Sequence, residues 1–118
     1  MVKSLFMNIT PLPAFTDNYI WLIEENGKAT VIDPGDANVV NNYLLEKNLR
    51  LESILITHHH YDHTGGVEQL KKSYECNVYG PYDSPFNGVE IKLKENDEIS
   101  IQGFSFKIIE VPGHTLDH

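Results

Sequence analysis

Four histidines and one aspartate lie within the seven residues from Thr57 to His63. Imidazole and carboxylate groups are the ligands that zinc and related transition metals take in hydrolytic sites. Alternate side chains of an extended segment point the same way, so His58 and His60 can face one metal ion while His59 faces elsewhere. Asp62 and His63 follow where the chain turns, and they can supply ligands to a second, neighbouring position. Paired metals of this kind are a recurring hydrolytic device.

A third imidazole follows a second apolar segment. His114 comes directly after Pro112-Gly113, at the end of the apolar run 104–111. If that run and the strand before the histidines are neighbours, His58, His60 and His114 meet at one rim. Three histidines with an open position form a catalytic zinc arrangement. Asp117 and His118 are expected to steady this turn rather than to bind metal.

The segments on either side of the histidines are of different kinds. Ser53-Ile54-Leu55-Ile56 is a short apolar, β-branched run, which is typical of a buried strand. In the segment 67–74, Val67, Leu70 and Tyr74 recur at helical spacing. The histidines are therefore predicted to lie on a strand-to-helix turn, which is where open α/β sheets place their binding sites.

The remaining chain reads as a mixed α/β fold. Asn26-Gly27 indicates a tight hairpin, and Asp36 is a plausible N-cap for a helix over about 37–48. Pro11 and Pro13 are expected to end the first strand. We expect a mixed sheet with helices on its outer face. The expected strands are 5–10, 19–23, 29–32, 53–56, 77–79, 89–93, 98–101 and 104–111.

Composition excludes several classes of protein. The chain has 118 residues, of which 41% are hydrophobic and 22% charged, and this fits one small globular domain. A net charge of −8 without a Lys/Arg cluster disfavours nucleic-acid binding. No apolar run approaches the ~20 residues of a membrane span, and no secretory signal is recognisable. The one cysteine, Cys76, cannot form an internal disulfide and is expected to be a small, half-buried side chain, so we expect a cytoplasmic protein.

These motifs resemble a known superfamily. The pattern His58-x-His60-x-Asp62-His63, followed by Gly65-Gly66 and later by Pro112-Gly113-His114-Thr115, is similar to that of the metallo-β-lactamase superfamily. The opening stretch 12–22 and the stretch 31–36 resemble hydroxyacylglutathione hydrolase, also called glyoxalase II.

The resemblance implies an αββα sandwich with two metals, zinc first and iron or manganese as substitutes, at one edge between the sheets. It also implies hydrolysis of a glutathione conjugate, S-lactoylglutathione, to lactate and glutathione. By this resemblance His58, His60 and His114 match the first metal site. Asp62 and His63 match part of the second, and Asp62 would also be catalytic.

The resemblance covers only the first half of such a sandwich. Residues 1–118 are therefore expected to form a single, incomplete domain. The family's bridging aspartate, a further histidine and the glutathione-binding residues have no counterpart in this chain. A sheet built to be covered by a second sheet exposes an apolar face. We expect the chain to self-associate or to pair with a missing C-terminal half.

Two other interpretations fit the same residues. Another enzyme of this fold, such as a mononuclear iron persulfide dioxygenase or a lactonase, could share the histidine motif. A non-catalytic module could hold one zinc through three histidines as a structural element. Metal content and thioesterase activity distinguish these alternatives.

Overall fold

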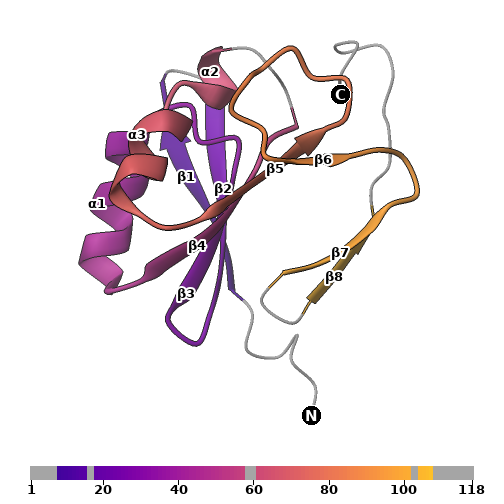
Figure 1. The fold of residues 1–118 in the computed structure, drawn as a ribbon. Coiled ribbons are helices and arrows are strands. Elements are labelled where there is room, and N and C mark those ends of the chain that lie inside the picture. Colours follow the sequence, from indigo (N-terminus) through magenta and orange to yellow (C-terminus); the bar gives the residue numbers. More distant parts are fainter. Residues whose placement is uncertain (1–7, 16–17, 58–60, 102–103, 108–118) are drawn as a thin grey trace.

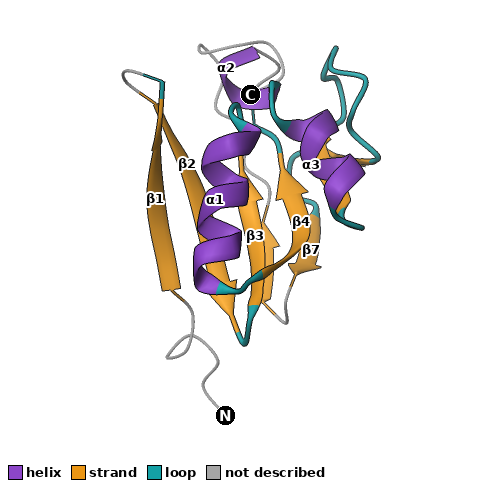
Figure 2. Cartoon of the chain, turned by 90° about the vertical axis from the view of Figure 1, so that its left-hand side faces the viewer, coloured by secondary structure: helices purple, strands orange, loops and turns teal. Residues whose placement is uncertain are grey.

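A single six-stranded sheet carries two helices on one of its faces (Figures 1 and 2). The computed structural model describes residues 8–15, 18–57, 61–101 and 104–107. A two-stranded hairpin lies on the other side of the sheet (Figure 1). The elements are β1 (Asn8–Ala14), β2 (Asn18–Glu25), β3 (Lys28–Ile32), α1 (Ala37–Lys47), β4 (Arg50–Leu55), α2 (Tyr61–Thr64), α3 (Val67–Ser73), β5 (Asn77–Pro81), β6 (Ile91–Leu93), β7 (Glu98–Ile101) and β8 (Phe104–Lys107).

The sheet is mixed, as predicted from the sequence. Its strands follow the order β1-β2-β3-β4-β5-β6. The first three strands pair antiparallel, and β3, β4, β5 and β6 pair parallel. Parallel neighbours need a crossover, and here α1 connects β3 to β4 while α2 and α3 connect β4 to β5. The carboxyl ends of β3 and β4 therefore meet at one edge, in the register Ile32 opposite Leu55.

Two local signals are confirmed in detail. Asn26 and Gly27 have φ angles of 54° and 81°, the positive values that a two-residue hairpin turn requires. Asp36 caps α1, because its carboxylate accepts a hydrogen bond of 2.9 Å from the backbone N–H of Asn38. The helix ends at Asn48, which has a left-handed φ of 55°.

The prediction that prolines end the first strand is wrong. Pro11 pairs with Trp21 and Pro13 with Tyr19 inside β1. Because β1 is an edge strand, alternate backbone N–H groups point away from the sheet and need no partner there. The two prolines are two residues apart, so both occupy outward positions.

The helix-covered face forms the hydrophobic core. The strands contribute Leu22, Val31, Ile54 and Val78, which are completely buried. The helices contribute fully or almost fully buried apolar side chains on one stripe, namely Val40, Leu44 and Leu70. Leu45 is 69% exposed because it lies one position beyond the buried row.

The opposite face is covered only in part. Ile23, Thr30 and Ser53 are buried on it. Tyr19 and Trp21 project from β2 on the same face and are 54% and 45% exposed, with ring centroids 6.2 Å apart. These two rings are therefore the large apolar side chains that this face leaves partly open to solvent.

The β7–β8 hairpin belongs to a separate sheet. β8 pairs antiparallel with β7, and no other strand of the described ranges pairs with it. Residues 104–107 therefore do not pair with the strand that delivers the histidines, because β4 lies between β3 and β5. Residues 108–111 of that expected strand lie outside the described residues.

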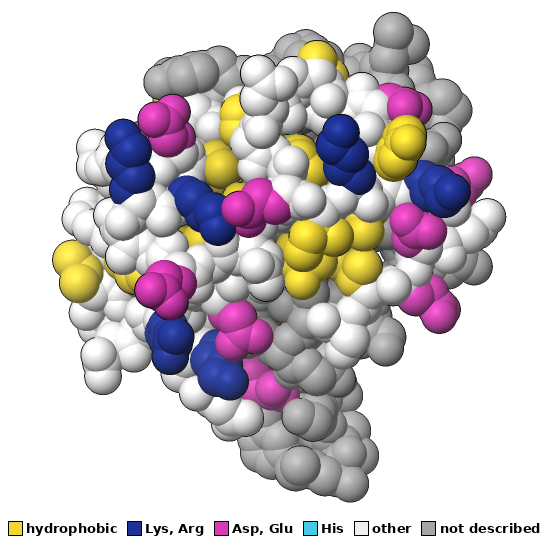
Figure 3. All heavy atoms as spheres, in the orientation of Figure 1, with side chains coloured by type: hydrophobic (Ala, Val, Ile, Leu, Met, Phe, Trp, Pro, Cys, Tyr) yellow, Lys and Arg dark blue, Asp and Glu magenta, His cyan; other side chains and the backbone are white. Residues whose placement is uncertain are grey.

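The molecular surface carries charges of both signs. In the orientation of Figure 1, basic and acidic side chains alternate over the visible face without a large patch of either sign (Figure 3). This agrees with the absence of a Lys/Arg cluster in the sequence.

Candidate metal centre

The predicted metal ligands are described unequally. His58, His59, His60, His114, Asp117 and His118 lie outside the described residues. The backbone of Asp62 is in α2, and His63 is described in full. Among the residues that the structure describes, no three His, Cys, Asp or Glu side chains are grouped closely enough to hold a metal. The complete ligand set therefore stays a prediction.

The flanks of the histidine segment are as expected. Ile54 and Ile56 are buried, and the N–H of Ile56 donates to the carbonyl of Tyr79 at 2.8 Å. This bond continues the sheet by one residue beyond the end of β4. Thr57 then leaves the sheet edge, and α2 begins at Tyr61. The interval 58–60 thus joins the carboxyl end of a buried strand to a helix.

A buried carboxylate on the neighbouring strand organises this edge. Asp33 follows β3, is 8% exposed and has a left-handed φ of 55°. Its Oδ1 accepts a hydrogen bond of 2.6 Å from the Thr57 N–H, and its Oδ2 accepts one from the Thr57 hydroxyl. Oδ2 also lies 3.2 Å from Nδ1 of His63. One carboxylate thus contacts the residues on both sides of the predicted ligand segment.

The position of this carboxylate bears on which nitrogen of His63 carries the proton. A carboxylate beside Nδ1 favours the tautomer that carries its proton on Nδ1. The lone pair is then on Nε2, which is the atom that binds metal when a carboxylate orients the ring. The His63 side chain is 20% exposed, so water or an ion can reach it. The residue therefore fits the metal role predicted for it.

Asp33 is a candidate functional residue that the sequence pattern does not single out, because the stretch 31–36 contributes only to a resemblance. A signal was present. Asp33 directly follows an apolar strand, and parallel strands bring their carboxyl ends to one edge. Its contacts with Thr57 and His63 depend on β3 and β4 being neighbours in the sheet, and a local sequence pattern does not reveal strand order.

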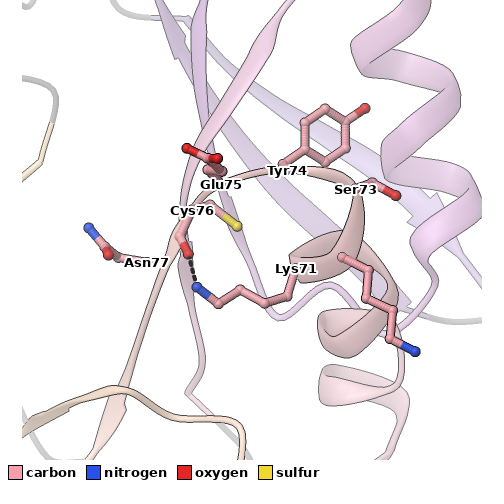
Figure 4. Close-up of a pocket in the computed structure, with 7 residues that line it drawn as sticks. Lys71, Ser73, Tyr74, Glu75, Cys76 and Asn77 are labelled. Atoms are coloured by element: carbon pink, nitrogen blue, oxygen red, sulfur yellow. Dashed lines mark hydrogen bonds between the residues drawn. The ribbon is translucent and has the colours of Figure 1, made fainter.

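Cys76 takes no part in this centre. It lies before β5, at the opposite edge of the sheet, in a polar hollow beside the end of α3 (Figure 4). The side chain is 5% exposed, and burial raises the pKa of its thiol. Lys71 donates to the carbonyl oxygen of Cys76 and also forms an ion pair with Glu90 at 3.0 Å. The thiol is therefore more buried than expected and stays protonated near neutral pH.

Among the described residues, no helix is both long and apolar enough to cross a bilayer.

The chain matches the family model described as the metallo-beta-lactamase superfamily over residues 14–118. That match covers most of the chain, and the chain therefore belongs to the metallo-beta-lactamase superfamily, as its histidine motif indicates.

Within that superfamily, the chain is similar to proteins named hydroxyacylglutathione hydrolase. It is 50% identical to that of Hahella chejuensis over 111 residues, which are 93% of this chain and 43% of the relative. It is 46% identical to that of Chromohalobacter salexigens over 114 residues, 95% of this chain and 45% of the relative. The chain thus spans less than half the length of these relatives.

Solved structures confirm the fold. The chain resembles the B3 metallo-beta-lactamase BLEG-1 with a TM-score of 0.79 at 22% identity, over 92% of this chain and 63% of that one. It resembles ETHE1 from Myxococcus xanthus with a TM-score of 0.75 at 24% identity, over 94% of this chain and 51% of that one. The αβ half-sandwich seen here is therefore a part of a larger architecture in both.

Proposed function

We propose that residues 1–118 form a single, incomplete metallo-β-lactamase domain that carries the metal-binding half of a thioester hydrolase. The substrate class is a glutathione thioester, such as S-lactoylglutathione. The identity of 46–50% with proteins named hydroxyacylglutathione hydrolase supports this assignment. The observation that carries it is the contact of the Asp33 carboxylate with Thr57 and His63, because it orients a histidine as a metal ligand beside the predicted cluster.

The proposed cofactor is zinc. His58, His60 and His114 would hold one ion, and Asp62 and His63 would contribute to a second. When bound, such ions polarise a carbonyl oxygen and lower the pKa of a water molecule towards ~7. Iron and manganese are the alternatives, since imidazole and carboxylate ligands suit them too.

The residues around the proposed metal centre then have separate roles. Asp33 holds the His63 ring in one orientation, and Thr57 anchors Asp33. Asp62 is the proposed catalytic residue, which orients the attacking water. In the overall reaction, water adds to the thioester carbonyl, the C–S bond breaks, and the products are a carboxylic acid and a thiol.

The partly covered sheet face defines the proposed partner. In the isolated chain we propose that a second copy packs on the surface formed by Tyr19 and Trp21, and that a C-terminal half takes its place where one is present. Sheet-on-sheet packing suits both occupants, since each would bring an apolar face. The acidic surface and the protonated single cysteine fit a cytoplasmic location.

The test combines metal content with catalysis on one sample. Protein purified without added metal is analysed by plasma mass spectrometry, and the hydrolysis of S-lactoylglutathione is followed. His58→Ala is expected to lose metal, whereas His59→Ala, the intervening histidine, is the matched control that keeps it. Wild-type protein that binds no metal would overturn the proposal.

The metal identity and turnover also decide between the alternatives. One zinc per chain without thioester hydrolysis supports a non-catalytic metal module. One iron per chain without thioester hydrolysis supports a mononuclear dioxygenase of this fold. Two metals with turnover support the hydrolase, with the missing ligands supplied by a partner chain.

A further inference from the structure

The turn between β3 and α1 contacts the segment after the histidines at a second point. The backbone N–H of Gly66 donates to the carbonyl oxygen of Pro34 at 2.9 Å. Gly66 is buried, and Pro34 is among the most deeply buried residues of the chain. Gly66 lies three residues after His63 and is the N-cap of α3, so this bond ties the junction between α2 and α3 to the same turn that supplies Asp33.

Gly66 is required here by space rather than by backbone conformation. Its φ of −94° and ψ of −7° are accessible to any residue. A Cβ atom at this position would lie 2.6 Å from the Pro34 carbonyl oxygen, 2.6 Å from the Ala37 nitrogen and 3.0 Å from the Ala37 Cα. Real Cβ atoms essentially never approach that closely, so the two segments would have to separate.

The atoms that a Cβ would meet cannot move easily. All three belong to the backbone of a turn that is fixed at both ends. The Asp33 N–H donates to the Leu55 carbonyl at 2.8 Å, and the Gly35 N–H donates to the Asp33 carbonyl at 2.8 Å. Asp36 caps α1 immediately afterwards. Relief would therefore come from displacement of the junction between α2 and α3, and α2, which carries His63, would move with it.

We propose that Gly66 is a positioning residue for the metal centre, because only a residue without a side chain lets α2 settle on the β3–α1 turn and brings His63 to the Asp33 carboxylate. This inference rests on the proposed function. It adds a residue that binds neither metal nor substrate and acts through His63.

The chain offers a matched control. Gly80 is also buried, and a Cβ there would lie 2.6 Å from a neighbour. That neighbour is Cγ2 of Val89, a side-chain methyl group that can rotate away. Gly80→Ala therefore reproduces the crowding without moving the β3–α1 turn.

The experiment compares Gly66→Ala with Gly80→Ala in two readouts. The first is the ¹⁵N chemical shifts of the His63 ring in metal-free protein, which report its tautomer. The second is zinc affinity, by competition with a chromophoric chelator. Gly66→Ala is expected to change the His63 shifts and to weaken zinc binding about tenfold, the lower end for loss of an orienting contact. Gly80→Ala is expected to leave both as in the wild type.

Wild-type His63 shifts and zinc affinity in folded Gly66→Ala would overturn the inference. If wild-type protein binds no zinc, the proposed function fails, while the metal-free shifts still test the positioning role.

A further measurement on the wild type covers the case in which the variant does not fold. Hydrogen exchange of the Gly66 amide is expected to slow when zinc is added. Unchanged exchange at saturating zinc would contradict the coupling.

Discussion

The two faces of the six-stranded sheet differ in how complete they are. On the helix-covered face, Leu22 of β2 is completely buried. On the other face, its neighbour Trp21 is 45% exposed although it lies in the same strand. Burial of apolar area is the main stabilising term in folding. The comparison teaches that α1 and α3 complete the core on one face, whereas the other face leaves large aromatic side chains partly exposed, which is why we propose a partner there.

The strongest test of this comparison uses the two neighbouring residues. Leu22→Ala is expected to cost about 2–5 kcal/mol in the free energy of unfolding, because it removes fully packed methyl groups. Trp21→Ala is expected to cost about 1 kcal/mol or less, as for other half-exposed sites. Urea denaturation followed by circular dichroism measures both. Equal losses would show that the second face is as well packed as the first.

The next largest effect is expected on zinc affinity, at the carboxyl ends of β3 and β4, where Asp33 lies beside the predicted ligands. Asn at position 33 tolerates the left-handed φ of 55° and can still accept the Thr57 N–H. Its NH₂ group beside Nδ1 of His63 favours the proton on Nε2, which then cannot bind metal. Asp33→Asn is therefore expected to weaken zinc binding about 10–100-fold.

A chelator competition assay measures that loss. Asp36→Asn is the control, since it changes the charge of the same turn while keeping the cap of α1. If both variants bind zinc like the wild type, the contact with His63 does not orient a ligand.

A smaller effect tests whether a second copy covers the exposed face. The double variant Tyr19→Ser/Trp21→Ser is expected to weaken self-association about tenfold, equivalent to ~1.4 kcal/mol. Leu45→Ser is the control, because Leu45 is 69% exposed but lies on α1. Sedimentation velocity over a concentration series measures the association. A wild-type chain that stays monomeric throughout would contradict the proposed partner.

The smallest expected effect is on the pH dependence of the free energy of unfolding, and it concerns the ion pair between Lys71 and Glu90. Lys71 lowers the pKa of Glu90 from its ordinary value of 4.5, mainly through a hydrogen bond. A carboxyl group with a lowered pKa stabilises the fold above its unfolded pKa, and this is lost as pH falls through the folded pKa. Glu90 is 44% exposed, so screening by solvent limits the gain to about 0.5 kcal/mol.

Thermal melts of Glu90→Gln and wild type measure this term. The difference is expected to be present at pH 7 and to vanish below about pH 4. Glu68→Gln, which removes an exposed partner of Lys72, is the control and is expected to change little at either pH. A difference that grows on acidification would contradict the sign.

Local signals in the sequence predicted most of this fold. The Asn26-Gly27 hairpin, the Asp36 cap and the strand before the histidines depend on neighbouring residues, and all three are confirmed. The prolines of β1 were misjudged because their tolerance depends on β1 lying at the sheet edge, which no local pattern reveals. Strand order is decided by contacts between distant segments.

In the candidate centre, too, local spacing was informative and contacts between distant segments were not predictable. The spacing of His58, His60, Asp62 and His63 suggested metal binding without any structure. Asp33 and Gly66 could not be found that way, because their roles depend on atoms of the neighbouring strand and turn. Asp33 and Thr57 are 24 positions apart in the chain. Gly66 lies against the backbone of Ala37 because the segment between α2 and α3 packs closely on the start of α1.

The two prolines of β1 also restrict how copies of the chain can meet. An open strand edge normally offers a row of N–H groups on which another strand can grow, as in amyloid fibrils. Pro11 and Pro13 remove two of these donors from the β1 edge, and the last strand at the other side, β6, has three residues and a lysine at its centre. Growth by strand addition is therefore disfavoured at both edges of the six-stranded sheet.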